Sequence, residues 1–193
     1  MTTSSESLAP EMSLRVRLMQ FFLWVSVIGW GIGFGAKLFD LIIVAGAWGA
    51  SPPTSLALMP YGPRYPMNPG DFFQPLSVLM VGGMLGALIS GWKTRFEYRF
   101  WLWLPVIMFL LIWIFTPTVF WPMIHELYGA GSGKIVISDA DAIHLVRRWF
   151  IWDWARVATI AVGFVSSIRA ISLPLRQKAV PSVYDRLKRS NGD

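Results

Sequence analysis

The chain has no cysteine and few charged residues. Without cysteine it cannot form disulfides, thiolate metal sites, iron–sulfur clusters or a cysteine nucleophile. Charged residues make up 15% of the 193 residues, against about 25% in an average soluble domain. Hydrophobic residues make up 54%, and the mean hydropathy is +0.51. Because a soluble domain of this size could not bury so much apolar surface, the sequence predicts that a lipid bilayer surrounds the protein.

Histidine is almost as scarce, which limits metal and cofactor chemistry. The only two histidines are His125 and His144, and neither falls within a predicted span. A transition-metal site would need both histidines together with a carboxylate such as Glu126, and haem ligation within a span would need a histidine there. We therefore expect no metal and no cofactor.

The net charge of +6 raises the possibility of a nucleic-acid partner. The basic residues, however, lie between the apolar runs and in the C-terminal tail, and no binding motif accompanies them. Topology in a membrane explains this distribution better, so no nucleic-acid partner is expected.

Four apolar runs predict four membrane-spanning helices, since one crossing takes about 20 residues. The expected spans are about 18–50, 72–92, 100–120 and 149–171. The predicted fold is all-α, an integral membrane four-helix bundle in one domain, 1–193, with polar tails at 1–13 and 172–193. The first run is too long for one crossing, so its helix is expected either to tilt and project outward or to bend at the glycine-rich segment 29–35.

Glycine spacing suggests where helices pack closely. Gly29/Gly33, Gly31/Gly35 and Gly82/Gly86 are each four residues apart, a spacing that lets helix backbones approach in lipid. We favour packing within the chain over a homo-oligomer or another membrane protein partner, although both remain open.

Proline and capping residues predict the connections. Seven of the thirteen prolines lie in 51–75, which is expected to be an apolar loop folded over the outer end of the bundle. Asp71 is the expected N-cap of the second span, and Pro117 is expected to bend or end the third. A polar connection should then follow over 121–137, with Ser138 starting a helix at Asp139.

The distribution of Lys and Arg predicts the orientation, because cytoplasmic flanks carry the excess of these residues. One face should hold eleven of them and the other four, which are Arg64, Lys134, Arg147 and Arg148. Both termini should therefore be cytoplasmic. The expected location is the cell membrane, most simply a bacterial inner membrane.

Two charged pairs lie within the predicted spans, where charges are costly and usually mark a bundle interior or a wet cavity. Lys37 and Asp40 are three residues apart near the outer end of the first span, and Asp153 and Arg156 are three apart in the fourth. Each pair shares a helix face and can neutralise itself. Trp149 and Trp152 extend the second pair into one stripe, whose composition is typical of a small-ligand site.

The predicted topology brings His125, Glu126 and His144 to the same outer level as these pairs. Asp153, Arg156 and His125 are the candidate catalytic residues. The candidate ligand-binding residues are Trp149, Trp152, Lys37, Asp40, Glu126 and His144. A network of ion pairs that fixes helix ends, a ligand site and a metal site all remain possible for this group, with the metal site least favoured.

The second half of the chain resembles the anthrone-oxygenase-like family of small four-span membrane proteins. The resemblance covers about residues 100–171 and rests on the segments FTPTVFWP at 115–122 and RWFIWDWAR at 148–156. The family tends to have Trp, then His four residues on, then Arg seven on. Trp149 and Arg156 match this pattern, and Asp153 stands in place of the histidine. In the region where the family often has Asn, this chain has Ile124 and His125.

This resemblance implies four helices with a polar pocket near one membrane face and, for some members, cofactor-independent oxygenation of polycyclic phenols. The first functional hypothesis is thus a membrane protein that binds or oxidises a lipophilic small molecule, with Asp153 or His125 taking a proton and Arg156 or Lys37 stabilising the anion. The alternatives are a non-catalytic subunit of a membrane complex and a small transporter.

Overall fold

The computed structural model describes residues 14–62 and 65–173, which form helices and no strand. The elements are α1 (Leu14–Phe39), the π-helical η1 (Asp40–Val44), α2 (Ala45–Trp48), the 3-10 helix η2 (Thr54–Leu58), α3 (Pro69–Ser90), α4 (Phe96–Phe115), the π-helical η3 (Thr116–Phe120), α5 (Trp121–Gly131) and α6 (Asp139–Ser172). The predicted all-α class is confirmed over this part of the chain.

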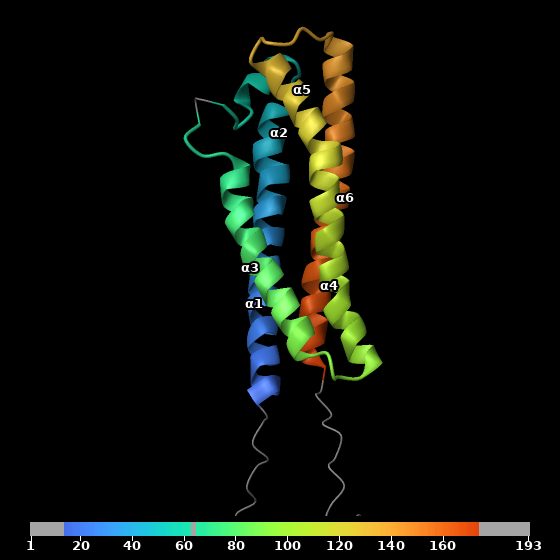
Figure 1. Ribbon diagram of the computed structural model, residues 1–193. Coiled ribbons are helices and arrows are strands. Elements are labelled where there is room, and N and C mark those ends of the chain that lie inside the picture. The colour runs from blue at the N-terminus through green and yellow to red at the C-terminus, as the bar shows by residue number, and fades with distance from the viewer. Residues whose placement is uncertain (1–13, 63–64, 174–193) are drawn as a thin grey trace, which may run out of the picture.

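Four continuous helical segments are long and apolar enough to cross a membrane. They are Leu14–Trp48, Pro69–Ser90, Phe96–Gly131 and Asp139–Ser172, one for each predicted span. The helices pack as α1 on α3, α4 on α6 and α1 on α6, and Figure 1 shows them side by side as an elongated bundle.

The third segment differs from the sequence prediction. Residues 121–137 were expected to be a polar connection, but α5 continues the helix to Gly131, so that prediction was wrong for most of its length. Pro117 neither ends nor breaks the helix, because the chain forms a π turn over Thr116–Phe120. Thr116 and Thr118 donate their hydroxyls to the carbonyls of Ile112 and Ile114, at 2.8 and 2.7 Å. These bonds satisfy backbone acceptors in the region where the prolines supply no N–H.

The first segment does not bend at its glycines. α1 is continuous through them, and the departure from α geometry comes later, at Asp40. Gly29 and Gly33 face the side chain of Met80 in α3, whereas Gly31 faces Phe164 in α6. Gly29, Gly31 and Gly33 therefore let one helix pack against two neighbours, as expected for packing within the chain. Gly35, in contrast, has no heavy atom within 4 Å of the place of a methyl group, so its predicted close packing was wrong.

The closest approach between the backbones of α1 and α3 occurs at a glycine that the spacing argument missed. A methyl group at Gly83 would lie 2.6 Å from the backbone nitrogen of Ser26, whereas one at Gly82 would have no heavy atom within 4 Å. The prediction that Gly82 packs closely was therefore wrong, while its partner Gly86 does pack, against Phe22. The spacing identified the right turn of the helix, but the glycine that faces α1 is Gly83 and not its neighbour Gly82.

Two caps start the second and fourth spans. Asn68, and not Asp71 as predicted, is the N-cap of α3, and Asp71 completes the capping box by accepting from the Asn68 backbone N–H at 2.8 Å. The prediction for α6 is confirmed, because the Ser138 hydroxyl accepts from the Asp141 N–H at 3.1 Å.

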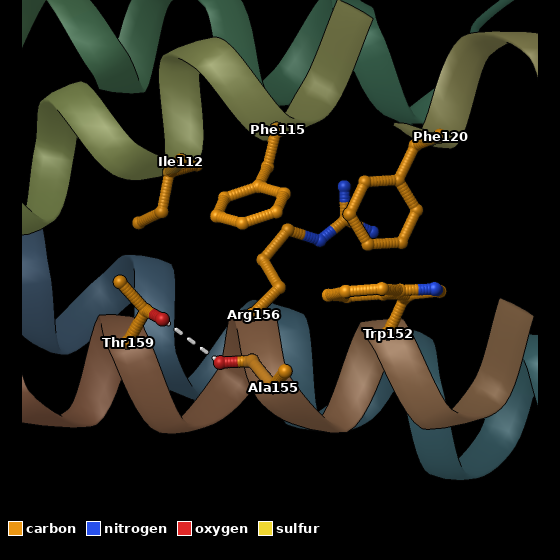
Figure 2. A pocket seen from close by; sticks show the side chains of 7 residues that line it. All are labelled: Ile112, Phe115, Phe120, Trp152, Ala155, Arg156 and Thr159. Carbon is orange, nitrogen blue, oxygen red and sulfur yellow. Dashed lines mark hydrogen bonds between the residues drawn. The ribbon is translucent and has the colours of Figure 1, made fainter. Parts of the chain in front are cut away.

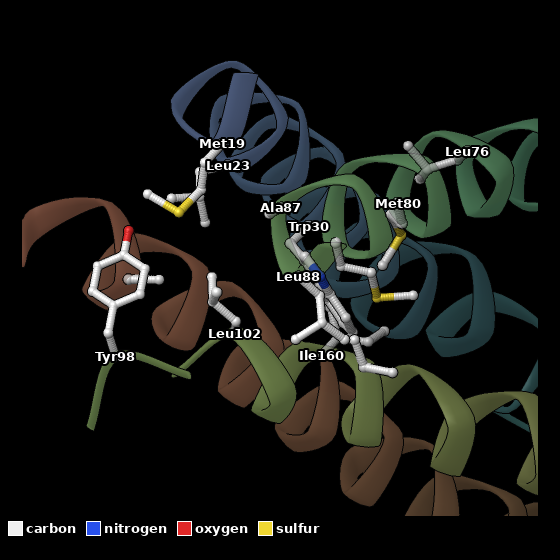
Figure 3. Packing of buried hydrophobic residues seen from close by; sticks show 13 residues of the cluster. Met19, Leu23, Trp30, Leu76, Met80, Ala87, Leu88, Tyr98, Leu102 and Ile160 are labelled. Carbon is white, nitrogen blue, oxygen red and sulfur yellow. The ribbon is translucent and has the colours of Figure 1, made fainter. Parts of the chain in front are cut away.

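The core has two parts along the bundle. One lies between α1, α3, α4 and α6, around Trp30, Met80, Leu102 and Ile160, as Figure 3 shows. The other lies toward the end that carries α2, η2 and α5, and includes Leu41, Trp48, Phe120 and Trp149. Leu56 and Met59 of the proline-rich loop are buried in this second part, so the loop packs onto the end of the bundle as predicted.

Candidate functional site

Asp153 is the centre of a buried group of charges. It lies on α6 with 0% of its surface exposed. Its Oδ1 accepts hydrogen bonds from Arg156, one turn further along the same helix, through Nε at 2.9 Å and through Nη2. Its Oδ2 lies 3.0 Å from the ammonium of Lys37. Two cations from two helices therefore neutralise one carboxylate, as a buried charge requires.

Lys37 connects this carboxylate to a second one. It lies on α1, is 4% exposed, and donates to Asp40 Oδ2 at 2.5 Å. Its ammonium also lies 5.4 Å from the centre of the Trp149 ring, within range of a cation–π contact. The four residues Asp40, Lys37, Asp153 and Arg156 form a line of alternating charge, here called the ionic cluster, and their formal charges cancel.

Both π turns border the ionic cluster. Asp40 is the first residue of η1, and Phe120, the last residue of η3, stacks against the Arg156 guanidinium at 3.8 Å from ring centre to Cζ. π turns are rare, and they occur frequently at functional sites, where the extra residue redirects side chains.

A groove between α4 and α6 ends at Arg156. We call it the α4–α6 groove. It is lined by Ile112, Phe115, Phe120, Trp152, Ala155, Arg156 and Thr159. Figure 2 shows Arg156 reaching from α6 between Phe115 and Phe120, with Trp152 alongside. Trp152 and Phe115 face each other with ring centres 5.7 Å apart. Thr159 donates its hydroxyl to the carbonyl of Ala155 in its own helix. Arg156 is the one charged residue of the lining.

The enclosed space of the groove is small. It measures about 30 Å³, room for roughly one or two water molecules. Phe115, Trp152 and Ala155 are nevertheless exposed on the outside of the bundle, so the groove is open sideways. A ligand larger than water would therefore place its polar head beside Arg156 and its body against the exposed rings.

Tyr61 is a neighbour of the cluster that sequence reasoning missed. It lies in the loop after η2, packs against the second part of the core, and its ring centre is 6.3 Å from that of Tyr128. Burial, together with the negative charge of Asp40, raises the pKa of Tyr61 to about 12. Its hydroxyl therefore stays protonated at neutral pH. Nothing in its local sequence pattern distinguishes it from other aromatic residues of the loop.

The remaining predicted residues divide into two sets. Trp149 lies in the core beside Lys37, and Trp152 lines the groove. His125, Glu126 and His144 are exposed and form no side-chain hydrogen bond or ion pair within residues 14–62 and 65–173. The reason is that α5 continues as a helix and turns His125 and Glu126 outward. In the same described ranges, no three His, Asp or Glu side chains gather in a way that could hold a metal ion.

Two buried polar atoms of the site lack a hydrogen-bond partner within the described residues. They are Nε1 of Trp149 and Oδ2 of Asp153. Lys37 is within ion-pair distance of Oδ2, but it donates its hydrogen bond to Asp40. Asp153 Oδ2 therefore has an ion-pair partner but accepts no hydrogen bond, and one of its lone pairs is free to accept a proton.

No family model, curated protein or solved structure matches this chain.

Proposed function

We propose that this chain is a multi-pass membrane protein that binds a weakly acidic, lipophilic small molecule in the α4–α6 groove. Arg156 carries the proposal, because it is the one charged group of an apolar groove and is held there by a fully buried carboxylate. Ionisable residues within spans are rare and tend to be functional.

The exposed surface of α6 supports a position of the cluster near one membrane face. Its first turns expose charged and polar side chains, among them Asp141, His144 and Arg148. The exposed residues are then apolar from Ile151 to Ile168, and a charge returns at Arg169. This apolar stretch is roughly 27 Å long at 1.5 Å per residue, close to the ~30 Å hydrocarbon thickness. Asp153 and Arg156 lie within the first two turns of this apolar stretch, close to its outer end.

The exposed rings beside the groove fit the same placement. Trp152 and Trp154 on α6 and Trp121 at the start of α5 are exposed, and tryptophan is enriched where hydrocarbon meets the headgroups. A lipophilic ligand could therefore enter the groove sideways from the bilayer, with its apolar body remaining in hydrocarbon.

Charge balance favours a ligand that arrives with its own proton. The ionic cluster is neutral, so adding an anion would leave one uncompensated charge in a medium of low dielectric constant. An acid instead brings a proton of its own. In this proposal the proton moves to Asp153, which lies behind Arg156 and does not itself line the groove, and the anion pairs with Arg156. The site then remains neutral, because Lys37 still faces Asp40. Asp153 acts as the base and Arg156 as the anion-stabilising group.

The first prediction concerns Arg156. In lipid nanodiscs, Arg156→Met should weaken binding of lipophilic phenols or carboxylic acids by about tenfold or more, as expected for loss of a charge-assisted hydrogen bond. Binding is measured by quenching of tryptophan fluorescence. Arg147→Met is the matched control, since Arg147 is an exposed arginine of the same helix and its loss should leave affinity unchanged. Equal binding by Arg156→Met would reduce the cluster to a network of ion pairs that fixes helices.

Oxidation of the bound molecule is a further part of this proposal and rests on the resemblance to the anthrone-oxygenase-like family. For a phenolic ligand that binds, oxygen uptake by the wild type but not by Asp153→Asn would support an enzyme. Binding without oxygen uptake would support a ligand-binding role alone.

A further inference from the structure

We propose that Asp40 is the proton-exchange site of the ionic cluster, and that Lys37 relays protons between Asp40 and the buried Asp153. The inference rests on the proposed function, since it assumes that the loop end of the bundle faces water. It adds a second opening to the site, with the ligand on the α4–α6 side and protons on the side of the proline-rich loop.

In the ionic cluster the two side chains at the ends of the line are partly exposed and the two in the middle are buried. Asp40 is 18% exposed and Arg156 13%, whereas Lys37 and Asp153 between them are 5% and 0% exposed. Both ends of the line thus reach the surface and its middle is closed. Asp40 is the only carboxylate of the four with access to the outside, so a proton that reaches or leaves Asp153 along this line passes through it.

Lys37 has the geometry of a relay. Its ammonium lies between two carboxylate oxygens, Asp40 Oδ2 at 2.5 Å and Asp153 Oδ2 at 3.0 Å. The Asp153 oxygen that faces Lys37 is the one without another hydrogen bond. When Asp153 has received a proton, Lys37 can give one of its protons to Asp40 and take the one from Asp153. Lysine is then unchanged, and one proton has moved from Asp153 to Asp40.

The surroundings of Asp40 define what else can respond to its charge. Lys37 contacts Asp40 directly from α1, whereas Asp153 and Arg156 of α6 lie on the other side of Lys37. Tyr61, in the loop after η2, lies near enough for the charge of Asp40 to act on it. Tyr61 keeps its proton at neutral pH and can therefore donate a hydrogen bond toward Asp40 without competing as a base. Chains of acidic groups of this kind serve as proton relays in membrane pumps and transporters.

NMR of the protein labelled with [γ-13C]aspartate tests the relay without any ligand. The signals of Asp40 and Asp153 are assigned from Asp40→Asn and Asp153→Asn. In the wild type, the Asp40 signal should titrate on acidification, and the Asp153 signal should shift with the same midpoint, because interacting sites titrate as a unit. In Lys37→Met, Asp153 should lose this shared midpoint. Asp141→Asn, which removes an exposed carboxylate of α6, should change neither signal.

Three results would overturn the proposal: an Asp40 signal that does not titrate, an Asp153 signal in the wild type that ignores the Asp40 transition, or a shared midpoint that survives in Lys37→Met. The first two are read from the wild type once its signals are assigned. If the asparagine variants fail to fold, Asp40→Glu and Asp153→Glu give the assignment, since they keep a carboxylate but lose the aspartate label. The ligand-binding assay is independent, because loss of the relay leaves binding by Arg156 intact, and absence of binding leaves the aspartate titration unaffected.

Discussion

At the scale of single residues, Tyr61 and Asp153 show how differently polar groups are held in this bundle. Asp153 is buried in the core with Arg156 against one of its carboxylate oxygens and Lys37 near the other. Tyr61 is half-buried, and burial and the negative charge of Asp40 outweigh the opposing effect of Arg156 on its pKa. The structure therefore favours the protonated phenol there.

This difference predicts a pH dependence of stability. The pKa of Tyr61 is raised from 10.0 to about 12 on folding. The raised pKa therefore adds to the free energy of unfolding in full below pH 10, and this addition is lost as the pH rises from 10 through 12. Tyr61→Phe should remove this part of the alkaline loss of stability, measured by unfolding in detergent at several pH values. Tyr65→Phe, an exposed phenol of the same loop, is the control. Parallel alkaline curves for wild type and Tyr61→Phe would refute the argument.

Sequence spacing predicted part of this site. The pairs Lys37/Asp40 and Asp153/Arg156 follow from a separation of three residues on a helix. The predicted topology placed both pairs at one level of the bundle, but it could not predict the contact between Lys37 and Asp153, since that contact depends on how far α1 is shifted along α6. Tyr61 could not be predicted either, because a loop that is rich in proline has no period from which to place a side chain.

At the scale of helices, α1 and α3 approach through Ser26 and Gly83. A methyl group at Gly83 would lie 2.6 Å from one backbone atom of Ser26 and 2.9 Å from another. Backbone atoms cannot move aside as a flexible side chain does, so the two helices would have to separate.

Two alanine variants provide the corresponding test. Gly83→Ala should destabilise the bundle by about 1–3 kcal/mol through overpacking. Gly82→Ala adds its methyl group to open space and should be neutral or stabilising by up to about 1 kcal/mol, as alanine favours the helix. Thermal unfolding in the same detergent measures both. If the two variants unfold together, the α1–α3 contact is not as close as described.

The helices themselves were largely predictable, and their ends were not. Four apolar runs led to four segments, because length and hydropathy are averages over many residues. The extension of the third helix to Gly131 was missed, because Pro117 and Pro122 are ordinarily helix breakers. Only the π turn and the bonds from the neighbouring threonines, which are details of one or two residues, allow the helix to continue.

At the scale of the whole molecule, the two ends of the bundle differ in construction. One end carries α2, η2, α5 and the proline-rich loop, whereas the start of α1, the end of α6 and the connection between α3 and α4 lie at the other (Figure 1). At this second end, Arg15 donates to the carbonyls of Ser90 and Ile89 at 2.6 and 3.3 Å. A cation thus interacts favourably with the negative C-terminus of α3.

The absence of cysteine makes the proposed orientation directly testable. Single cysteines at Thr54 and Lys93, both exposed at opposite ends of the bundle, can be treated with a membrane-impermeant maleimide. In intact bacterial spheroplasts the reagent should label Thr54→Cys, while Lys93→Cys should react only after the membrane is permeabilised. The cysteine-free parent is the blank, and the reverse pattern would place both termini on the outer side.

The π turn at Asp40–Val44 also matters for how the chain tolerates changes of length. Gly33, Lys37, Leu41 and Ala45 are all buried at steps of four, although each step of four in a regular α-helix drifts by about 40°. The one additional residue of a π turn offsets most of the drift that three such steps accumulate. Deleting one residue from Asp40–Val44 would let the segment close into a regular α-helix, so Trp48 and the loop beyond it would keep nearly the same direction. The same deletion within the regular helix Leu14–Phe39 would swing them about 100° around the axis. This short segment is therefore the place where the first membrane helix tolerates the loss of a residue.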